Sequence, residues 1–267
     1  VQVILLECLF EVFHFEVNSD VTLIEWLQRE RRRNVDVLME LPLTGTLQIL
    51  PGTDHAEGSL LGKNSIVIDD ELSALIVIDV QNDFCPGGAL AVTGGDEIVA
   101  GVNAAMDNFD AVILTQDWHP AGHSSFASHH GAAPMSLIDM PYGQQVLWPD
   151  HCVQGSQGAQ FHADLAIDRA DLILRKGYNP AIDSYSAFFE NDHETPTGLA
   201  GYLRTRGITR LSMVGLATDF CVNYSAVDAA KLGFDVTVQM DLCRAIDVQG
   251  SLEAATNGMI AAGVSLV

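Results

Sequence analysis

The sequence predicts an α/β protein built on a mainly parallel sheet, and three observations lead to this fold class. Short apolar runs bounded by turn residues recur from Ser73 onward, as buried parallel strands do. Stretches with apolar residues at helical spacing separate several of these runs. Asp79, Lys176 and Cys221 stand where three of the runs end. Because ligands bind outside the carboxyl ends of parallel strands, we expect these side chains to meet at one edge of the sheet.

Six runs are predicted as strands: residues 74–80, 111–116, 171–176, 210–216, 235–240 and 263–267. Four predicted helices lie among them, at residues 96–108, 197–206, 221–232 and 251–262. This alternation indicates a six-stranded sheet with helices on both faces. The interval 119–170 is different, because it is rich in proline, glycine and polar residues. A loop of this length inside a compact domain usually has a function.

The first 70 residues do not share the alternating pattern. They contain one predicted helix, residues 23–33, that ends in three arginines, as suits the negative end of a helix dipole. We find no catalytic, binding or metal-ligand motif in these residues. We therefore expect an N-terminal extension of unknown structure and function over residues 1–70, and the functional domain over residues 71–267. The sequence leaves open whether the chain, which begins with Val1, is a fragment.

The composition excludes some classes of partner. With 13 basic and 35 acidic residues, the formal net charge is −22, which argues against nucleic acid and against anionic membranes. Hydrophobic residues make up 48% of the chain, enough for a full core. Its five cysteines are dispersed, without CxxC spacing, which fits a reducing compartment. No signal peptide is visible either, so we expect a cytoplasmic protein; a homo-oligomer is left open.

Cys221 is the candidate nucleophile. It follows an apolar run and opens a helical pattern, where the positive end of the helix dipole favours a thiolate. Either Thr218 or Asp219 is a candidate cap for this helix. Taken alone, a single cysteine is more often a small buried hydrophobic residue. Its place between a strand and a helix favours catalysis instead.

Two charged residues are candidate partners of this thiol. Asp79 ends an apolar run, where a carboxylate is costly unless it is paired, and it could act as general base toward Cys221. Lys176 could stabilise both negative charges. The alternative for Asp79 is a structural role at the strand end, although Asp83 suits that role better, and a lysine after a strand is usually solvated.

A metal site is predicted from Asp117, His119 and His151. Asp117 and His119 are two residues apart at the end of a strand, so their side chains point the same way. His151, from the long loop, would complete a set of one oxygen and two nitrogen ligands, which suits Zn²⁺, Fe²⁺ or Mn²⁺. His123 is the reserve ligand. With nine histidines in the chain, a chance pair is the competing explanation.

Together these motifs resemble those of nicotinamidases, also called pyrazinamidases, within the isochorismatase-like cysteine hydrolases. The resemblance covers about residues 73–267 and has no counterpart in the first 70. The matching segments, in order, are 78–84 (IDVQNDF) with 86–88 (PGG), 116–120 (QDWHP), 148–152 (WPDHC), 176–177 (KG), 183–186 (DSYS) and 215–222 (GLATDFCV).

The resemblance implies a Rossmann-like three-layer α/β/α fold and assigns roles to residues of this sequence. Asp79, Lys176 and Cys221 would be the catalytic triad, and Asp117, His119 and His151 would hold one divalent metal, with zinc expected first and iron or manganese as alternatives. Phe84 and Trp148 would flank a pyridine ring, and Tyr185 would line the pocket. A cis peptide is expected before Ala217, with the N–H groups of Ala217 and Cys221 forming an oxyanion hole.

The implied activity is hydrolysis of a linear amide C–N bond. Nicotinamide, the small-molecule substrate, would give nicotinate and ammonia through a thioester on Cys221, pyrazinamide would be a further substrate, and the reaction would serve NAD salvage. The nearest alternative is another amidase of the superfamily, such as an N-carbamoyl amidohydrolase, but those generally lack the metal set. An isochorismatase would lack the cysteine. A non-catalytic metal-binding protein on the same fold is the alternative from another class.

Overall fold

The computed structural model describes residues 2–4, 14–16, 37–41, 48–51 and 64–66 as strands, and residues 72–267 continuously. The chain divides into two compact units, Val1–Asp70 and Glu71–Val267. Each unit is described by itself below.

The first unit contains short antiparallel strands. β1 (Gln2–Ile4) pairs with β2 (His14–Glu16). β3 (Val37–Leu41) lies between β4 (Gln48–Pro51) and β5 (Asn64–Ile66) in a separate sheet. The helix predicted over residues 23–33 lies outside the described residues.

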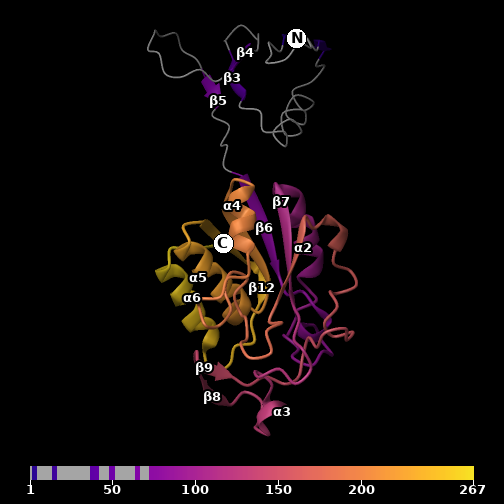
Figure 1. Cartoon of the computed structure of the whole chain (residues 1–267). Helices are drawn as coiled ribbons and strands as arrows, with labels where there is room; N and C mark the ends of the chain where they lie inside the picture. Colours follow the sequence, from indigo (N-terminus) through magenta and orange to yellow (C-terminus); the bar gives the residue numbers. More distant parts are fainter. Residues whose placement is uncertain (1, 5–13, 17–36, 42–47, 52–63, 67–71) are drawn as a thin grey trace. The chain divides into compact units, whose positions relative to one another are not determined.

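The second unit is built on a six-stranded sheet in the order β10-β7-β6-β11-β12-β13. All neighbouring strands in it pair in parallel. Of the strands in this sheet, β6 and β7 come first along the chain and pair inside the sheet, and the later strands are added on either side of them (Figure 1). The strands are β6 (Leu72–Ile78), β7 (Ala111–Asp117), β10 (Leu172–Lys176), β11 (Ile208–Leu216), β12 (Asp235–Arg244) and β13 (Ser265–Leu266).

Helices cover both faces of this sheet. On one side lie α4 (Leu199–Thr205), α5 (Asn223–Lys231) and α6 (Ser251–Ala261), and on the other lies α2 (Val99–Ala105), as Figure 1 shows. The α/β fold with a mainly parallel six-stranded sheet, predicted from the sequence, is therefore confirmed. Among the described residues, no helix has both the length and the apolar character that a membrane span requires.

The alternation of side chains along β6 divides the interior into two cores. Ala74, Ile76 and Ile78 pack with the helices of the α5 side, whereas Leu75 and Val77 pack with those of the α2 side. Successive side chains of a strand point to opposite faces, so an apolar run without polar interruptions is what a strand buried on both faces requires.

Several element boundaries differ from the sequence prediction. β6 ends at Ile78 rather than at residue 80, because Asp79 has a positive φ of 48° and leaves the extended conformation. β12 continues to Arg244, four residues beyond the predicted end. The predicted helix start at Cys221 is replaced by a π-helical turn, Thr218–Val222, that leads into α5 at Asn223.

The long interval 119–170 contains elements that the sequence did not predict. A hairpin joins β8 (Leu137–Met140) to β9 (Gly143–Val146) through a two-residue turn. A single helical turn, α3 (Ala127–His130), precedes it. Both lie at the lower end of the unit in Figure 1, below the carboxyl ends of the sheet strands. Pro141 and Gly143, with its φ of 123°, are the turn signal in the sequence.

Candidate active site

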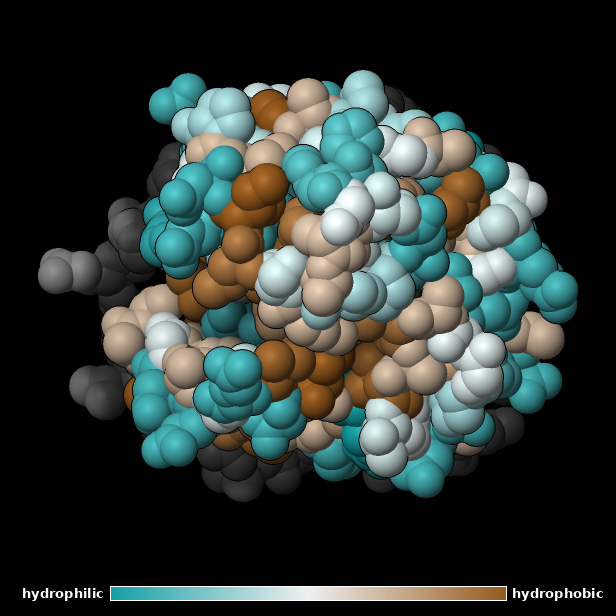
Figure 2. Space-filling view, turned by 90° about the horizontal axis from the view of Figure 1, so that it is seen from below, coloured by the Kyte–Doolittle hydropathy of each residue, from teal (hydrophilic) through white to brown (hydrophobic). Residues whose placement is uncertain are grey.

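The candidate site lies where four neighbouring strands end. Asp79 follows β6, Asp117 and Lys176 are the last residues of β7 and β10, and Cys221 lies in the turn after β11. The sheet order places these strands side by side. Figure 2 views this end of the unit, where apolar surface gathers toward the middle of the face. The structure thus brings together the side chains that the sequence predicted to converge.

Lys176 is the centre of the site and is fully buried. Its Nζ lies 2.9 Å from Asp79 Oδ2 and 3.1 Å from Asp117 Oδ1, and it donates to the carbonyl oxygen of Ser184 at 2.8 Å. Cys221 Sγ lies 3.5 Å away. Burial alone would lower the pKa of Lys176, but the carboxylates of Asp117 and Asp79 outweigh it and hold this pKa well above the ordinary value. The ammonium is therefore charged and holds the site together.

Asp79 is held by Thr115 as well as by Lys176. Thr115 Oγ1 donates to Asp79 Oδ1 at 2.6 Å and accepts from the Asp79 backbone N–H at 3.1 Å. Asp79 Oδ2 lies 2.9 Å from Lys176 Nζ. A carboxylate oxygen has two lone pairs, so Oδ2 can accept a proton as well as face the ammonium. Burial raises the pKa of Asp79, although the charge of Lys176 opposes this. A raised pKa suits a carboxylate that must accept a proton.

The resting state of Cys221 differs from the sequence prediction. Burial raises the pKa of its thiol well above the ordinary value, and the charges of Asp79 and Asp117 add to this, while Lys176 opposes it. The position before α5 was expected to favour a thiolate, whereas burial and the two carboxylates outweigh the charge of Lys176 and keep the pKa of the thiol high. Cys221 is therefore a thiol at rest, and its proton must be removed for attack.

The predicted helix cap is also wrong. The turn that holds Cys221 begins after Ala217, and neither Thr218 nor Asp219 makes a side-chain cap there. Asp219 accepts instead from the backbone N–H groups of Ile246 at 3.0 Å and Asp247 at 2.8 Å. The carboxylate thus ties the loop before α6 to the cysteine turn. The expected cis peptide before Ala217 is confirmed.

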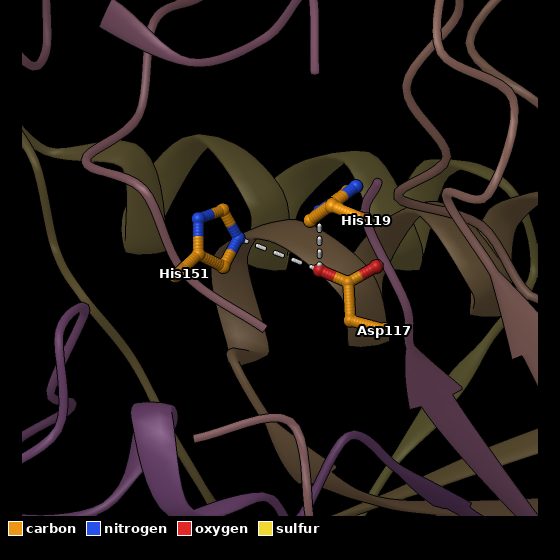
Figure 3. Close-up of side chains that lie close together, drawn as sticks. All are labelled: Asp117, His119 and His151. Atoms are coloured by element: carbon orange, nitrogen blue, oxygen red, sulfur yellow. Dashed lines mark hydrogen bonds and ion pairs between the residues drawn. The ribbon is translucent and has the colours of Figure 1, made fainter. Parts of the chain in front are cut away.

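Asp117, His119 and His151 form a compact group of ligand atoms (Figure 3). Asp117 Oδ2 lies 3.0 Å from His119 Nε2 and 3.4 Å from His151 Nε2. Each histidine uses its other nitrogen, Nδ1, to donate to a backbone carbonyl, that of Gly177 or Pro149, at 2.8 Å. In the neutral ring, both Nε2 lone pairs then point toward the Asp117 oxygen. Three converging electron pairs fit a divalent cation, and the carbonyls fix the ring orientations.

The charges of this group are strongly coupled. Burial would raise the pKa of Asp117, but His119 and Lys176 hold it well below the ordinary value. Burial would likewise lower the pKa of His119, but Asp117 raises it to about 9. The site thus prefers a positive charge beside Asp117, which a proton on His119 or a metal ion can provide.

His123, the reserve ligand, lies next to this group but has other partners. Its ring centroid is 4.5 Å from that of His119. Its Nε2 donates to the carbonyl of Asn179 at 2.7 Å, and its Nδ1 accepts from the Ser125 backbone N–H at 3.1 Å. His119, His123 and Asp183 form a second group of converging ligand atoms. Both nitrogens of His123 are engaged, so it would have to exchange a hydrogen bond to bind a metal.

Gly177 makes room for His119. A Cβ at this position would lie 2.5 Å from His119 Cε1 and 2.8 Å from its Nδ1. The residue also has a φ of 67°, which residues with a side chain rarely adopt. Only glycine therefore lets the chain turn after Lys176 while its carbonyl receives the histidine proton.

A pocket opens at this end of the sheet, and Asp117, His151 and Cys221 lie in its wall. The residues predicted to contact the substrate, Phe84, Trp148 and Tyr185, line it, as does Ala217. The lining also includes four residues to which the sequence analysis assigned no function: Leu90, Asp183, Phe220 and Ile246.

The sequence model of the isochorismatase domain matches residues 73–267, the whole of the part just described. The chain belongs to the isochorismatase family. The family resemblance predicted from the sequence is thus confirmed.

Several curated relatives within the family are nicotinamidases. The chain is 54% identical over 195 residues to the nicotinamidase of Acinetobacter baylyi, covering 73% of this chain and 91% of that protein. It is 46% identical over 198 residues to the nicotinamidase of Escherichia coli, covering 72% of this chain and 93% of that protein.

Solved structures agree. A nicotinamidase/pyrazinamidase of Acinetobacter baumanii matches with a TM-score of 0.73 and 52% identity over 75% of this chain and 97% of that one. A protein of L. infantum in complex with nicotinate gives 0.66 and 41%, over 76% and 95% of the two chains. The pyrazinamidase of Pyrococcus horikoshii in complex with zinc gives 0.60 and 36%, over 73% and 98%.

Proposed function

We propose that the chain hydrolyses nicotinamide to nicotinate and ammonia, with Cys221 as the nucleophile. The observation that carries the proposal is a buried cysteine, carboxylate and lysine beside a three-ligand metal site, with Cys221, Asp117 and His151 lining one cavity. The nicotinamidase function predicted from the sequence is confirmed by relatives that are 54% and 46% identical over most of their length. The assignment of roles to single residues is our proposal.

Asp79 acts as the base that prepares the thiol. Its Oδ2 has a lone pair available, and its raised pKa makes it able to hold the proton of Cys221. The thiolate then attacks the amide carbon and forms a C–S bond. Asp79 returns the proton to the amide nitrogen, so that ammonia leaves and a thioester remains. Water attacks the thioester, passes its proton to Asp79 and releases nicotinate, and Cys221 recovers its proton.

Lys176 has an electrostatic role in this sequence. Its charge lies 2.9 Å from Asp79 and 3.5 Å from Cys221, so it stabilises whichever of the two is negative. The backbone N–H groups of Ala217 and Cys221 are assigned to the oxyanion that forms during attack. Both residues line the cavity, as this assignment requires.

Asp117, His119 and His151 are assigned as ligands of one divalent metal ion. A bound ion would act as a Lewis acid that coordinates the ring nitrogen of nicotinamide and so orients the carboxamide. A set of two imidazoles and one carboxylate suits zinc first, with iron and manganese as alternatives. The zinc complex of the 36% identical pyrazinamidase supports this order.

The aromatic lining suits a flat ring. Trp148 packs edge-on against Phe220, with ring centroids 4.9 Å apart, and Tyr185 packs edge-on against the same ring at 5.8 Å. Phe84 completes this aromatic lining, together with Trp148 and Tyr185 as predicted. Pyrazinamide has a ring of the same size and is the proposed second substrate.

The wider setting remains at the level of proposal. We assign catalysis to residues 71–267 and no function to the extension over residues 1–70, since the family match begins at residue 73. The proposed substrate is a small molecule and not nucleic acid. We propose that the reaction serves NAD salvage and takes place in the cytoplasm. Homo-oligomer formation is left to measurement.

The test is ammonia release from nicotinamide by the purified full chain supplied with zinc, iron or manganese, beside Cys221→Ala. Release by the wild type and none by the variant is expected. Release by both would contradict the covalent mechanism. Release by neither, together with turnover of an N-carbamoyl amide, would favour the other amidase activity.

A further inference from the structure

The hairpin β8–β9 carries one buried polar side chain, Gln145. Its neighbours Gly143 and Gln144 are exposed, whereas Gln145 has no exposed surface. An amide that is buried without hydrogen bonds costs about 1–3 kcal/mol. A buried glutamine at this position therefore destabilises the fold unless its amide is hydrogen-bonded.

Two of the side chains that contact Gln145 line the cavity. The Gln145 Nε2 lies 3.0 Å from Asp183 Oδ2, 2.7 Å from the Tyr185 hydroxyl and 2.8 Å from the Val146 carbonyl oxygen, and its Oε1 accepts from Asn191 Nδ2 at 3.1 Å. The carboxylate of Asp183 only accepts, so the nitrogen of the amide must be the atom that faces it. The orientation of the amide is thus fixed by chemistry.

The two pocket residues held by Gln145 come from one segment, and Asn191 holds that segment as well. Asn191 Oδ1 accepts from the Tyr185 backbone N–H at 3.0 Å. Asp183 and Tyr185 both line the cavity. A single side chain from the hairpin therefore connects β9 to the part of the wall that contains these two residues.

The Tyr185 hydroxyl receives a second hydrogen bond in addition to that from Gln145. Trp148 Nε1 donates to it at 3.0 Å. The Trp148 N–H and the Gln145 amide nitrogen thus both face the hydroxyl oxygen. Its oxygen is held in place from two sides, by the hairpin and by an aromatic residue that also lines the cavity.

We propose that Gln145 is a positioning residue that sets substrate recognition: it fixes the Tyr185 hydroxyl and the Asp183 carboxylate at the cavity wall, which makes the β8–β9 hairpin a specificity element for flat aromatic amides. The proposal rests on the proposed nicotinamide hydrolysis. It assigns Gln145 no contact with the reacting atoms. Its loss should therefore weaken substrate binding more than it slows the chemical step.

The test compares Gln145→Met with Gln144→Met in the metal-loaded full chain. Methionine keeps the length of the side chain and removes both polar ends, and Gln144 offers the same change at an exposed position of the same strand. For Gln145→Met, we expect KM for nicotinamide to rise roughly tenfold, with kcat changed by less than about threefold. Gln144→Met should match the wild type. Equal effects of the two variants, or a loss in kcat alone, would overturn the proposal.

A double-mutant cycle tests whether Gln145 acts through Tyr185. Tyr185→Phe should raise KM by a similar factor, and the double variant with Gln145→Met should be no worse than the larger single effect. Fully additive losses would show that the two residues act independently. If Gln145→Met does not fold, Gln145→Asn keeps the amide but shortens its reach toward Asp183 and Tyr185, and a rise in KM is again expected.

Calorimetry with nicotinate separates this proposal from the proposed function. A wild type that releases no ammonia from nicotinamide would sink the proposed function. A loss of nicotinate affinity in Gln145→Met that is absent in Gln144→Met would still support the positioning role. Equal nicotinate affinity in both variants would count against it.

Discussion

Two regions of the cavity are built in different ways. The strand-end cluster, Asp79, Asp117 and Lys176, lies at the ends of paired strands and is held by ion pairs of 2.9 and 3.1 Å. The loop wall, Tyr185 and Ile246, lies on irregular segments and is held by single side chains from elsewhere, Gln145 and Asp219. The chemistry is thus anchored in the sheet, whereas substrate recognition depends on a few long-range hydrogen bonds. Substitutions in the strand-end cluster should reduce both catalysis and stability, whereas substitutions in the loop wall should mainly weaken substrate recognition.

The largest effect is expected for Lys176→Met. It leaves two carboxylates buried without their cation, and breaking a buried pair in this way costs about 3–5 kcal/mol. We expect kcat/KM to fall at least about a thousandfold, since the charge beside Cys221 is also lost. Steady-state kinetics and urea unfolding measure the two losses. Arg169→Met, which removes an exposed cation from the surface ion pair with Asp107, is the control and should be near neutral.

The next largest effect is expected for His151→Ala. Removal of one of three ligands should lower metal affinity on the order of a hundredfold or more and raise KM more than it disturbs the fold. Metal content by atomic absorption and KM for nicotinamide are the measurements. His129→Ala, at an exposed histidine of the same long loop, is the control. Full metal occupancy in His151→Ala would remove this residue from the ligand set.

Gly177→Ala tests how tightly the cluster is packed. The new methyl group would lie 2.5 Å from His119 Cε1, so the imidazole must move and metal affinity should fall. Gly233→Ala is a matched control, because Gly233 also has a positive φ, of 89°, but nothing lies within 4 Å of its Cβ position. Backbone strain of about 1–2 kcal/mol is expected in both variants, and any further loss belongs to the contact with His119. Equal losses in stability and metal affinity would contradict this assignment.

The smallest effect is a shift in pH dependence in Thr115→Val. Asp79 must be deprotonated to accept the cysteine proton, so activity rises with pH through the Asp79 pKa. The Thr115 hydrogen bond favours the charged form and lowers this pKa. Its removal should move the acidic limb of the kcat/KM profile upward by roughly one pH unit. Thr237→Val, at a half-buried position of β12, should leave the limb unchanged.

The sequence pattern predicted the first region well. In the second region the family resemblance predicted Tyr185 at the pocket, but Ile246 and the residues that hold the wall were missed. Asp79, Asp117 and Lys176 end apolar runs, and the parallel sheet makes the ends of such runs meet, so local pattern and topology together suffice. Gln145 and Asp183 carry no such signal, because their role depends on contacts between loops about 40 residues apart. The raised pKa of the Cys221 thiol could not be predicted for a related reason: its largest cause is burial, which is a property of the whole fold.

Strand β6 should tolerate substitution far better than insertion. Its alternate residues belong to two separate cores, so exchange of one apolar residue for another of similar volume disturbs one core only. A single residue inserted within the strand would turn every following side chain of the strand toward the opposite core. It would also shift Asp79 relative to its neighbours on β7 and β11. In a comparison of natural variants, length changes should therefore collect in the turns and be missing from residues 72–78.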